Sequence, residues 1–222
     1  MGFHGYAGHI LYVDLSAKKV KKETLSGELI RNYIGNLGIN TKLAYDLIQP
    51  ETDPLSPENP IIFGTGPLGG TTAPACSRSN ANYKSPLTHL FGSANSGDSI
   101  ALMLKFAGFD HLVISGKAEG PVYLKIDDDE VQILDATHLW GKDVFETTDT
   151  LWAELKDYWI NCIGPAGENL VRFASAVTNK HSLYGRTGIG AVMGSKNLKA
   201  IVARGSKGIT VADRKRFFKI VD

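Results

Sequence analysis

The stretch that decides the fold reads Pro86-Leu-Thr-His-Leu-Phe-Gly-Ser-Ala-Asn-Ser-Gly-Asp-Ser-Ile-Ala-Leu-Met-Leu-Lys-Phe-Ala-Gly-Phe-Asp110. Small and polar residues over 93–98 lead into apolar residues at Ile100, Leu104 and neighbouring positions, a pattern that predicts a helix. The free N–H groups and the dipole at a helix start favour an anion such as phosphate. Many capped helices bind nothing, so an ordinary capped helix remains the alternative interpretation here.

The composition predicts a globular protein with one large domain or two small ones. The chain has 222 residues, of which 43% are hydrophobic and 21% charged, enough to bury a sizeable core. Its net charge is +1, so no overall field draws it to nucleic acid or to an anionic membrane. The sequence has no signal-peptide pattern and no apolar run long enough to span a bilayer. We therefore expect a cytoplasmic protein with no nucleic-acid and no membrane partner.

Cys76 and Cys162 are the only cysteines, and they are far apart in sequence. Without CxxC spacing they predict neither a disulfide framework nor a zinc or iron–sulfur site within this chain. A reducing compartment fits this cysteine content best.

Local patterns predict the elements of the first half. His9–Ser16 and Lys18–Thr24 read as a hairpin, and Ser26 is expected to cap a helix. A second helical pattern runs through Leu43 to Ile48, and the prolines over 53–60 predict an irregular segment.

The segment Pro60–Gly70 contains the spacing GxGxxG, at Gly64, Gly66 and Gly69. A dinucleotide site needs the third glycine in a helix and an acidic residue about twenty positions on, whereas here a proline follows and Lys84 stands at that distance. We therefore expect the glycines to allow a tight turn and a close approach of the backbone to a neighbour or a ligand.

The rest of the chain is expected to alternate strands and helices. The patterns predict strands over Cys76–Tyr83, Asp110–Gly116, Pro121–Ile126, Glu130–Leu134, Tyr158–Ile163, Val171–Val177 and Lys199–Arg204. A helix is expected over Asp143–Lys156, and Gly164–Asn169 is expected to be a turn.

A glycine-rich segment follows at Asn179–Lys199. Its four glycines, at 185, 188, 190 and 194, together with Arg186 and Lys196, suggest a backbone-lined anion cradle. The spacing does not match a Walker motif, because the segment from Gly190 to Lys196 is one residue too short.

Several motifs in a fixed order resemble one family, the tungsten-containing aldehyde:ferredoxin oxidoreductases, in their N-terminal domain. The resemblance runs from about Gly8 to Lys207, and the motifs that carry it are Pro54–Asn59, Gly66–Leu68, Ser85–Thr88, Ala94–Gly97, Leu104–Gly108, Ile163–Leu170, Gly185–Arg186 and Gly190–Ala200.

The resemblance implies an α+β fold in which two β-sheets with a few flanking helices form a base for the cofactor. That cofactor is tungstopterin, a tungsten (or molybdenum) atom held by two pterins whose phosphates are linked through magnesium. The full enzymes oxidise aldehydes to carboxylic acids and pass electrons to ferredoxin through a 4Fe-4S cluster. The cluster ligands and the acid–base residues lie outside the matched domain, so the resemblance implies that this chain alone is inactive.

The site residues that the resemblance implies form two groups. Arg78 matches an arginine near a pterin, and Asn95, Ser96 and Gly97 match the phosphate and magnesium site. Leu183, Gly185 and Arg186 fall on the second half of that site. Asn95 and the main-chain carbonyl of Leu183 are the implied magnesium ligands, which suits the preference of magnesium for oxygen. Ser182 and Leu37 stand where related enzymes carry arginine.

Residues 1–208 are expected to form the pterin-binding domain. Residues 209–222 read as a linker and the first helix, capped by Asp213, of a downstream domain that would be a partner within the same polypeptide. Homo-oligomerisation is left open. The alternative function is a non-catalytic domain that binds a phosphorylated metabolite or an assembly partner through the same glycines, and a nicotinamide dehydrogenase ranks third.

Overall fold

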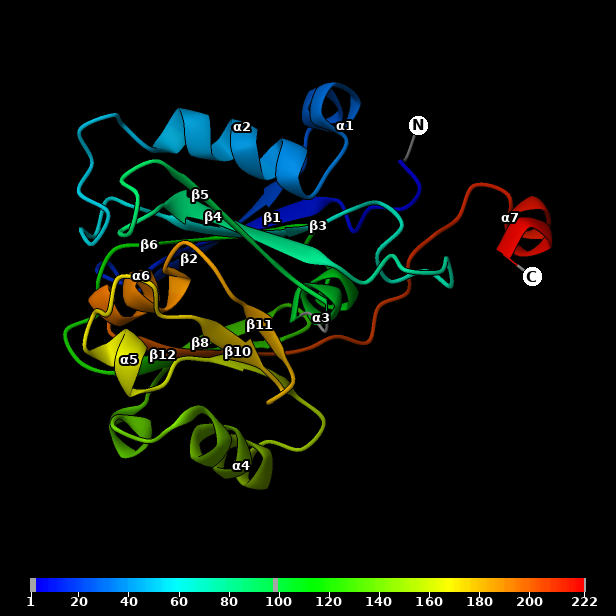
Figure 1. The fold of residues 1–222 in the computed structure, drawn as a ribbon. Helices are drawn as coiled ribbons and strands as arrows, with labels where there is room; N and C mark the ends of the chain where they lie inside the picture. The colour runs from blue at the N-terminus through cyan, green and yellow to red at the C-terminus, as the bar shows by residue number, and fades with distance from the viewer. Residues whose placement is uncertain (1–2, 98–99, 222) are drawn as a thin grey trace.

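The computed structural model describes residues 3–97 and 100–221. Two six-stranded sheets lie face to face, with helices between them and on both outer faces (Figure 1). The predicted α+β fold with two sheets is thereby confirmed.

The first half of the chain builds one sheet, from the hairpin at its start to the strand before Gly116. Its elements are β1 (His9–Asp14), β2 (Lys19–Thr24), α1 (Gly27–Tyr33), α2 (Leu37–Leu47), β3 (Ile61–Thr65), β4 (Ser79–Lys84), β5 (Phe91–Ser96), α3 (Ile100–Ala107) and β6 (His111–Ser115).

The second half builds the other sheet in the same manner. Its elements are β7 (Val122–Asp127), β8 (Glu130–Asp135), a 3-10 turn (Thr137–Leu139), α4 (Val144–Glu154), β9 (Trp159–Cys162), α5 (Pro165–Glu168), β10 (Ala176–Thr178), β11 (Ser182–Tyr184), α6 (Ile189–Ser195) and β12 (Leu198–Arg204).

The two halves repeat one topology. Across the first sheet the strands run β2-β1-β6-β3-β4-β5, and across the second they run β8-β7-β12-β9-β10-β11. In each sheet one pair is parallel, β1 with β6 and β7 with β12, and the remaining pairs are antiparallel. This repeat was not predicted from the sequence.

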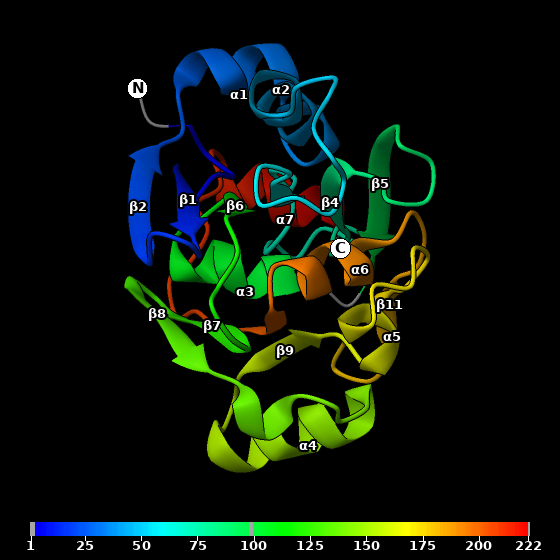
Figure 2. The same ribbon diagram turned by 90° about the vertical axis from the view of Figure 1, so that its left-hand side faces the viewer.

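Three apolar clusters hold these layers together. The central cluster lies between the sheets and includes residues of both, with α3 and α6 packed inside it (Figures 1 and 2). A second cluster packs α1 and α2 on the outer face of the first sheet, and a third packs α4 on the outer face of the second. The inner faces of both sheets are therefore shielded from water, which leaves the strand ends and loops as the accessible backbone.

Most of the predicted elements are confirmed, and their ends have local causes. The Ser26 side chain accepts a hydrogen bond from the Leu29 amide, at 3.2 Å, and so caps α1 as expected. At α4, Asp143 and Glu146 form a capping box, which satisfies two otherwise unpaired N–H groups. The hairpin β1–β2 and the strands β6, β7, β8, β9 and β12 also lie where the patterns place them.

Three predictions about individual segments are wrong. Ser93–Ser96 do not lead into the helix as part of its start; they belong to β5, which pairs with β4. Only Ala176 and Val177 of the predicted strand Val171–Val177 are strand, because the preceding residues turn to meet α6, where the Gly190 amide donates to the Ala174 carbonyl. The expected turn at Gly164–Asn169 contains a short helix, α5, with Pro165 at its first position.

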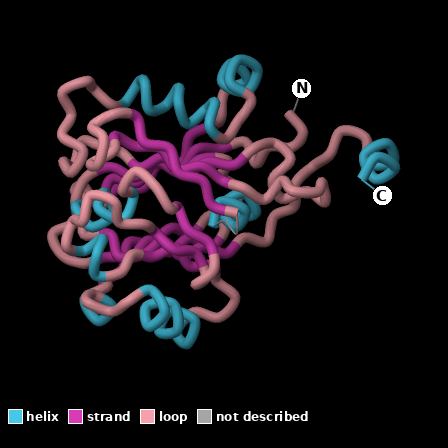
Figure 3. The backbone as a smooth tube through the Cα atoms, in the orientation of Figure 1, coloured by secondary structure: helices cyan, strands magenta, loops and turns pink. Residues whose placement is uncertain are grey.

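The last helix, α7 (Arg214–Val221), stands apart from the two sheets (Figures 1 and 3). Asp213 caps it as predicted, since its carboxylate accepts a hydrogen bond from the Arg216 amide at 3.0 Å. No residue of α7 is buried within the part of the chain that the structure describes. Over the same residues, no helix has the length and apolar character needed to cross a bilayer.

Candidate cofactor site at the ends of β5 and β11

The predicted site residues gather where the edges of the two sheets meet. Strand β11 contacts β5, and a hydrogen bond between Ser79 Oγ and Tyr184 OH, 2.5 Å long, joins the sheets at this point. Both residues are fully buried. The seven predicted residues lie on or next to β4, β5 and β11, the strands at this contact.

Four of the seven lie on the first sheet, beside Ser79. Arg78 is the residue before Ser79, and Ser96 is the direct strand partner of Ser79. Asn95 is the partner of Asn80, and Gly97 follows at the end of β5. The register therefore places Arg78 beside the 95–97 segment.

The other three lie on the second sheet, around Tyr184. Leu183 precedes Tyr184 on β11, and Gly185 and Arg186 follow it in the loop that leads to α6. The predicted residues thus lie along one rim of the molecule, the contact of β5 with β11: four at the start of β4 and the end of β5, and three on β11 and the loop after it.

Most of these residues are accessible. Arg78, Asn95, Gly185 and Arg186 are exposed, and Leu183 is 53% exposed. Ser96 is buried, since its side chain lies on the opposite face of β5 from that of Asn95, and among the described residues its hydroxyl has no hydrogen-bond partner. A ligand on the rim would therefore reach Ser96 through its main chain.

The rim carries two arginines, one from each sheet. Within the described part of the chain, neither Arg78 nor Arg186 takes part in an ion pair. A guanidinium group offers several donors in a fixed fork that matches phosphate oxygens. Two such unpaired groups, one from each sheet, make this rim suitable for a ligand that carries phosphate.

The loop that carries Arg186 is held in place by Tyr83 of β4 and by Ser85, the residue that follows β4. The Tyr83 hydroxyl donates to the Arg186 carbonyl at 3.0 Å and lies 2.7 Å from Thr187 Oγ1. Ser85 Oγ donates to the Thr187 carbonyl at 2.8 Å. Burial raises the pKa of Tyr83, so its hydroxyl keeps the proton that it donates. The second half of the rim is therefore fixed by the first sheet.

Three residues of the predicted anion cradle over Asn179–Lys199 cannot take part in one: Gly190, Gly194 and Lys196. Both glycines are buried in α6, and a Cβ at Gly194 would lie 2.0 Å from the Gly167 carbonyl oxygen. Gly194 allows α6 to pack closely on α5, and Gly190 allows it to lie against the backbone of Ala174 and Ser175. Lys196 is fully buried as well, and its ammonium donates to the carbonyls of Pro57 and Gly116 at 3.1 and 3.2 Å.

Two other predictions concern the start of α3 and the GxGxxG segment. α3 is described from Ile100 on, and the residues directly before it, 98 and 99, lie outside the described residues, so the predicted helix start stays a prediction. The close approach expected of the glycines is confirmed at Gly64, where a Cβ would lie 2.4 Å from both Asn40 Oδ1 and His111 Nδ1.

Residues that the sequence did not point to also shape the rim: Ser79, Tyr184, Asn80 and Tyr83. Ser79 and Tyr184 are 105 positions apart, and no local pattern links them. Asn80 and Asn82 alternate along β4, which puts both amides on one face of the strand, but the sequence does not show which residues they contact.

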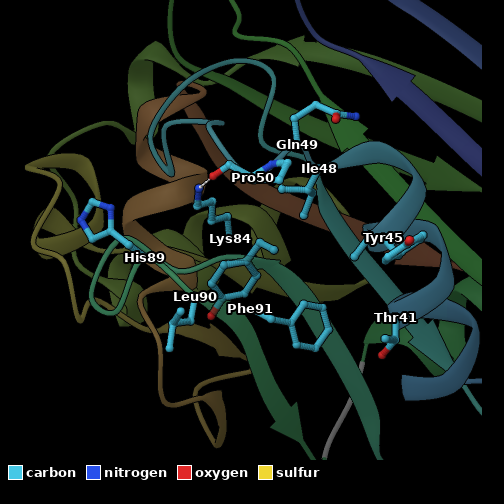
Figure 4. A pocket seen from close by; sticks show the side chains of 11 residues that line it. Thr41, Tyr45, Ile48, Gln49, Pro50, Lys84, His89, Leu90 and Phe91 are labelled. Atoms are coloured by element: carbon cyan, nitrogen blue, oxygen red, sulfur yellow. Dashed lines mark hydrogen bonds between the residues drawn. The ribbon is translucent and has the colours of Figure 1, made fainter.

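Two pockets lie near these elements. Arg78 lines a small one of about 270 Å³ with Cys76 and the loop 66–69. A wider and mainly apolar pocket of about 720 Å³ lies between α2 and the start of β5, where Tyr45, Pro50, Leu90 and Phe91 face it (Figure 4). None of the seven predicted residues lines the wider pocket, so volume alone does not mark the candidate site.

The donor set fits a phosphate-bearing cofactor with a hard cation. Among the described residues, no three His, Cys, Asp or Glu side chains gather into a metal-binding group. The rim offers instead the amide of Asn95 and main-chain oxygens, which suit magnesium when phosphates supply its remaining ligands. At Gly97 a Cβ would meet nothing within 4 Å, which leaves open space beside the backbone.

Comparison with known proteins identifies the family. Residues 10–205 match the family model described as the N-terminal domain of aldehyde ferredoxin oxidoreductase. The chain belongs to the aldehyde ferredoxin oxidoreductase family. The resemblance expected from the motifs is thereby confirmed.

Relatives in the family cover the whole chain. The tungsten-containing aldehyde ferredoxin oxidoreductase of Pyrococcus abyssi is 48% identical over 219 residues, which are 98% of this chain and 36% of that protein. The corresponding protein of Pyrococcus furiosus is 46% identical over 220 residues. A relative with another substrate in its name, the WOR-like subunit of an aliphatic sulfonate oxidoreductase, is 38% identical. The chain thus spans about a third of the length of these oxidoreductases.

A solved structure has the same fold. The chain matches part of the active-site complex BamBC of benzoyl coenzyme A reductase, solved with 1,5-dienoyl-CoA, with a TM-score of 0.95 and 39% sequence identity. The match covers 98% of this chain and 34% of that one.

Proposed function

We propose that this chain is the cofactor-binding domain of an aldehyde ferredoxin oxidoreductase-type enzyme and holds a bis-pterin tungsten or molybdenum cofactor. The observation that carries the proposal is the rim along the contact of β5 with β11, which carries Arg78 and Asn95 from the first sheet and Arg186 from the second. The names of the family relatives, which are tungsten-containing oxidoreductases, support the choice of metal.

Each residue of the rim would have a definite part. Arg78 and Arg186 would bind pterin or phosphate oxygens, one from each sheet. Asn95 and the carbonyl of Leu183 would supply oxygens to a magnesium ion between the phosphates. The backbone at Ser96, Gly97 and Gly185 would approach the phosphates closely, since two of these three positions have no side chain.

The bound cofactor would supply the two-electron oxidation of an aldehyde to a carboxylic acid. Electrons would leave through a 4Fe-4S cluster to ferredoxin, as the relatives' names suggest for the acceptor. The cluster ligands and the substrate pocket would come from residues outside this chain, and residues 1–208 would form the cofactor domain while 209–222 lead to the next one. The two free cysteines fit a cytoplasmic location.

The test is the cofactor content of the full-length protein after purification under reducing conditions. We expect tungsten or molybdenum, with two pterins for each metal atom, by elemental analysis and by pterin fluorescence. Arg78→Ala and Arg186→Ala should each lower the content about tenfold, because each removes a charge-assisted contact. Arg31→Ala, on α1 at the far face of the first sheet, is the matched control and should leave it unchanged.

A full-length protein with neither metal nor pterin would refute the proposal. If such a protein instead bound a phosphorylated metabolite at the same arginines, the non-catalytic alternative would take its place.

A further inference from the structure

The loop between β11 and α6, Gly185–Gly188, contains two successive residues with a positive φ. Gly188 has a φ of +87°, and a Cβ there would lie 2.1 Å from the Arg172 carbonyl oxygen, so this position needs glycine. Thr187 has a φ of +67°. A β-branched residue rarely adopts a positive φ, because this costs free energy that the surroundings must offset. Contacts from outside the loop are therefore expected to hold Thr187, and they are present.

These contacts come from Tyr83, on β4, and from Ser85. The Arg186 carbonyl oxygen lies 3.0 Å from the Tyr83 hydroxyl and 2.7 Å from Thr187 Oγ1, and the two hydroxyls are 2.7 Å apart. Whichever hydroxyl donates to the other, the carbonyl of Arg186 keeps at least one donor. Ser85 Oγ donates to the carbonyl of Thr187 at 2.8 Å. Two successive carbonyls of the loop are thus bound by residues of the first half of the chain.

Threonine at 187 is explained by its contact with Tyr83. Glycine would adopt the positive φ without strain, but it has no hydroxyl. The Thr187 hydroxyl completes a cluster with Tyr83, whose side chain is fully buried, so water competes little for this hydrogen bond. The ends of the loop are fixed as well, since Tyr184 and Ile189 are fully buried. The hydrogen bonds and the strain at Thr187 therefore decide the path of Arg186, which lies between these ends.

We propose that Tyr83 is a positioning residue for the main chain of Arg186 and that it acts through Thr187. This assignment rests on the proposed function, since it takes Arg186 as a contact of the cofactor. Without the Tyr83 hydroxyl, the strain at Thr187 favours another path of the loop, and the main chain of Arg186 is no longer fixed against the first sheet. The cofactor is then released faster, because the contact from Arg186 is made for only part of the time.

The test is a double-mutant cycle on cofactor release from the full-length protein. Release is measured as the metal and pterin that separate from the protein on gel filtration after timed incubation, which needs no catalytic turnover. Tyr83→Phe and Thr187→Val each remove one hydroxyl and keep the shape of the side chain, and each should speed release about threefold to tenfold. Since both act on one hydrogen bond, the double variant should release the cofactor no faster than the faster single variant.

Thr187→Ser is the conservative variant that should restore the parent behaviour. It keeps the hydroxyl that contacts Tyr83, so release should stay within about twofold of the parent. Trypsin gives a second measurement that does not involve the cofactor, because it cuts after Arg186 only when the loop leaves its fixed path. Cleavage there, identified by mass spectrometry, should be faster in Tyr83→Phe and Thr187→Val and unchanged in Thr187→Ser.

Tyr158→Phe is the matched structural control. Tyr158 is also buried, and its hydroxyl donates to Asp127 at 2.7 Å, in a contact that does not involve the loop. The substitution should lower the free energy of unfolding through the lost hydrogen bond and leave both release and cleavage after Arg186 within about twofold of the parent. Release rates that follow folding stability in Tyr83→Phe and Tyr158→Phe alike would overturn the proposal.

The remaining outcomes separate this assignment from the proposed function. Parent-like release in Tyr83→Phe, or multiplicative effects in the double variant, would overturn the role of Tyr83 even where Arg186→Ala lowers the cofactor content. An unchanged cofactor content in Arg186→Ala would instead remove Arg186 from the proposed site. If Tyr83→Phe does not fold, Thr187→Val and Thr187→Ser test the same hydrogen bond, and equal release rates for these two variants would refute it.

Discussion

The first half of the chain, β1 to β6, and the second half, β7 to β12, have the same order of strands across their sheets but stabilise their buried polar groups differently. The first half buries a network of neutral amides, with Asn40 at its centre. The second buries an ion pair between Lys199 on β12 and Glu168 on α5. One topology thus tolerates either solution, provided that each buried polar group is paired.

The candidate site lies at the same position in the topology of each half. It lies where each half passes from its edge strand to the helix between the sheets: after β5 in the first half and after β11 in the second. The first half contributes an exposed side chain, Asn95, whose amide is hydrogen-bonded to the Asn80 side chain. The second contributes the loop with Arg186, which depends on Tyr83 and Ser85 of the first sheet for its position.

The largest expected effect comes from breaking the ion pair of the second half. Glu168→Gln leaves the Lys199 ammonium, which is fully buried, without its counter-charge. Loss of one partner of a buried pair costs about 3–5 kcal/mol, so the free energy of unfolding should fall by that amount in urea titrations. The double variant with Lys199→Met should recover most of the loss.

Glu119→Gln provides the matched control for that prediction. Glu119 pairs with Lys18 at the surface, where both side chains are mostly exposed. Loss of this ion pair should cause no measurable change in the free energy of unfolding. If Glu168→Gln costs less than about 1 kcal/mol, the Lys142 carbonyl, 2.7 Å from Lys199 Nζ, is enough to stabilise the buried charge.

The neutral network of the first half should be broken by Gly64→Ala. The new Cβ would lie 2.4 Å from Asn40 Oδ1 and from His111 Nδ1, so it would separate the two groups that form the inner end of the network. We expect a loss of about 2 kcal/mol in the free energy of unfolding, from overpacking and a broken buried hydrogen bond.

Gly66→Ala, two positions away, tests whether that loss is specific. The nearest atom to a Cβ at Gly66 is 3.9 Å away, so the substitution should change stability by less than about 0.5 kcal/mol. Equal losses of unfolding free energy for Gly64→Ala and Gly66→Ala would show that the effect comes from replacing a glycine of this segment and not from breaking the network.

What could be predicted from the sequence was mainly local. The caps Ser26 and Asp143 act on amides two or three positions away, and both were predictable from residue type and spacing. β5 was not, because the residues that it buries, Gly92, Ala94 and Ser96, have little strand preference of their own. Its pairing with β4 decides its conformation.

At the candidate site, too, contacts between distant parts of the chain could not be predicted. Family motifs pointed to the residues on the rim, but no sequence pattern links Ser79 with Tyr184 across 105 positions. Glycine-rich sequence was also ambiguous: Gly194 was counted toward an anion cradle, whereas it lets α6 and α5 pack closely. A helix contact and an anion cradle both need backbone without side chains, so composition alone does not separate them.

A pH dependence should reveal a feature that the halves do share, a buried lysine held by carbonyl oxygens. Lys105 on α3 donates to the Gly66 carbonyl at 2.6 Å, and Lys196 follows α6 in the second half. Burial lowers the pKa of each to about 8, although Asp110 near Lys105, and Glu58 and Asp14 near Lys196, oppose the shift.

Between pH 8 and 9 the folded chain therefore releases these protons while the unfolded chain, with lysine pKa values of 10.5, retains them. Stability must rise with pH in this window, by about 1 kcal/mol for each lysine. Urea titrations at pH 8 and 9 should show the rise, and Lys105→Met or Lys196→Met should each halve it. Above pH 9 the raised pKa of Cys162, about 11, acts in the opposite direction.

The smallest expected effect concerns a surface contact between the halves. Asp129, in the turn between β7 and β8, pairs with Lys207 and with Lys22 on β2, each at 2.6 Å. The hydrogen bond from Lys207, and after it the one from Lys22, lower the pKa of Asp129 to about 2. The stabilisation that Asp129 gives the folded state is therefore present above about pH 4 and is lost as the pH falls toward 2.

The Asp129 carboxylate is 61% exposed, and water and salt screen its ion pairs. Asp129→Asn should cost about 0.5 kcal/mol at pH 7 in low salt and nothing measurable in 1 M NaCl. A cost that persists in high salt would mean that the halves are joined here by directed hydrogen bonds, whose strength does not depend on screening.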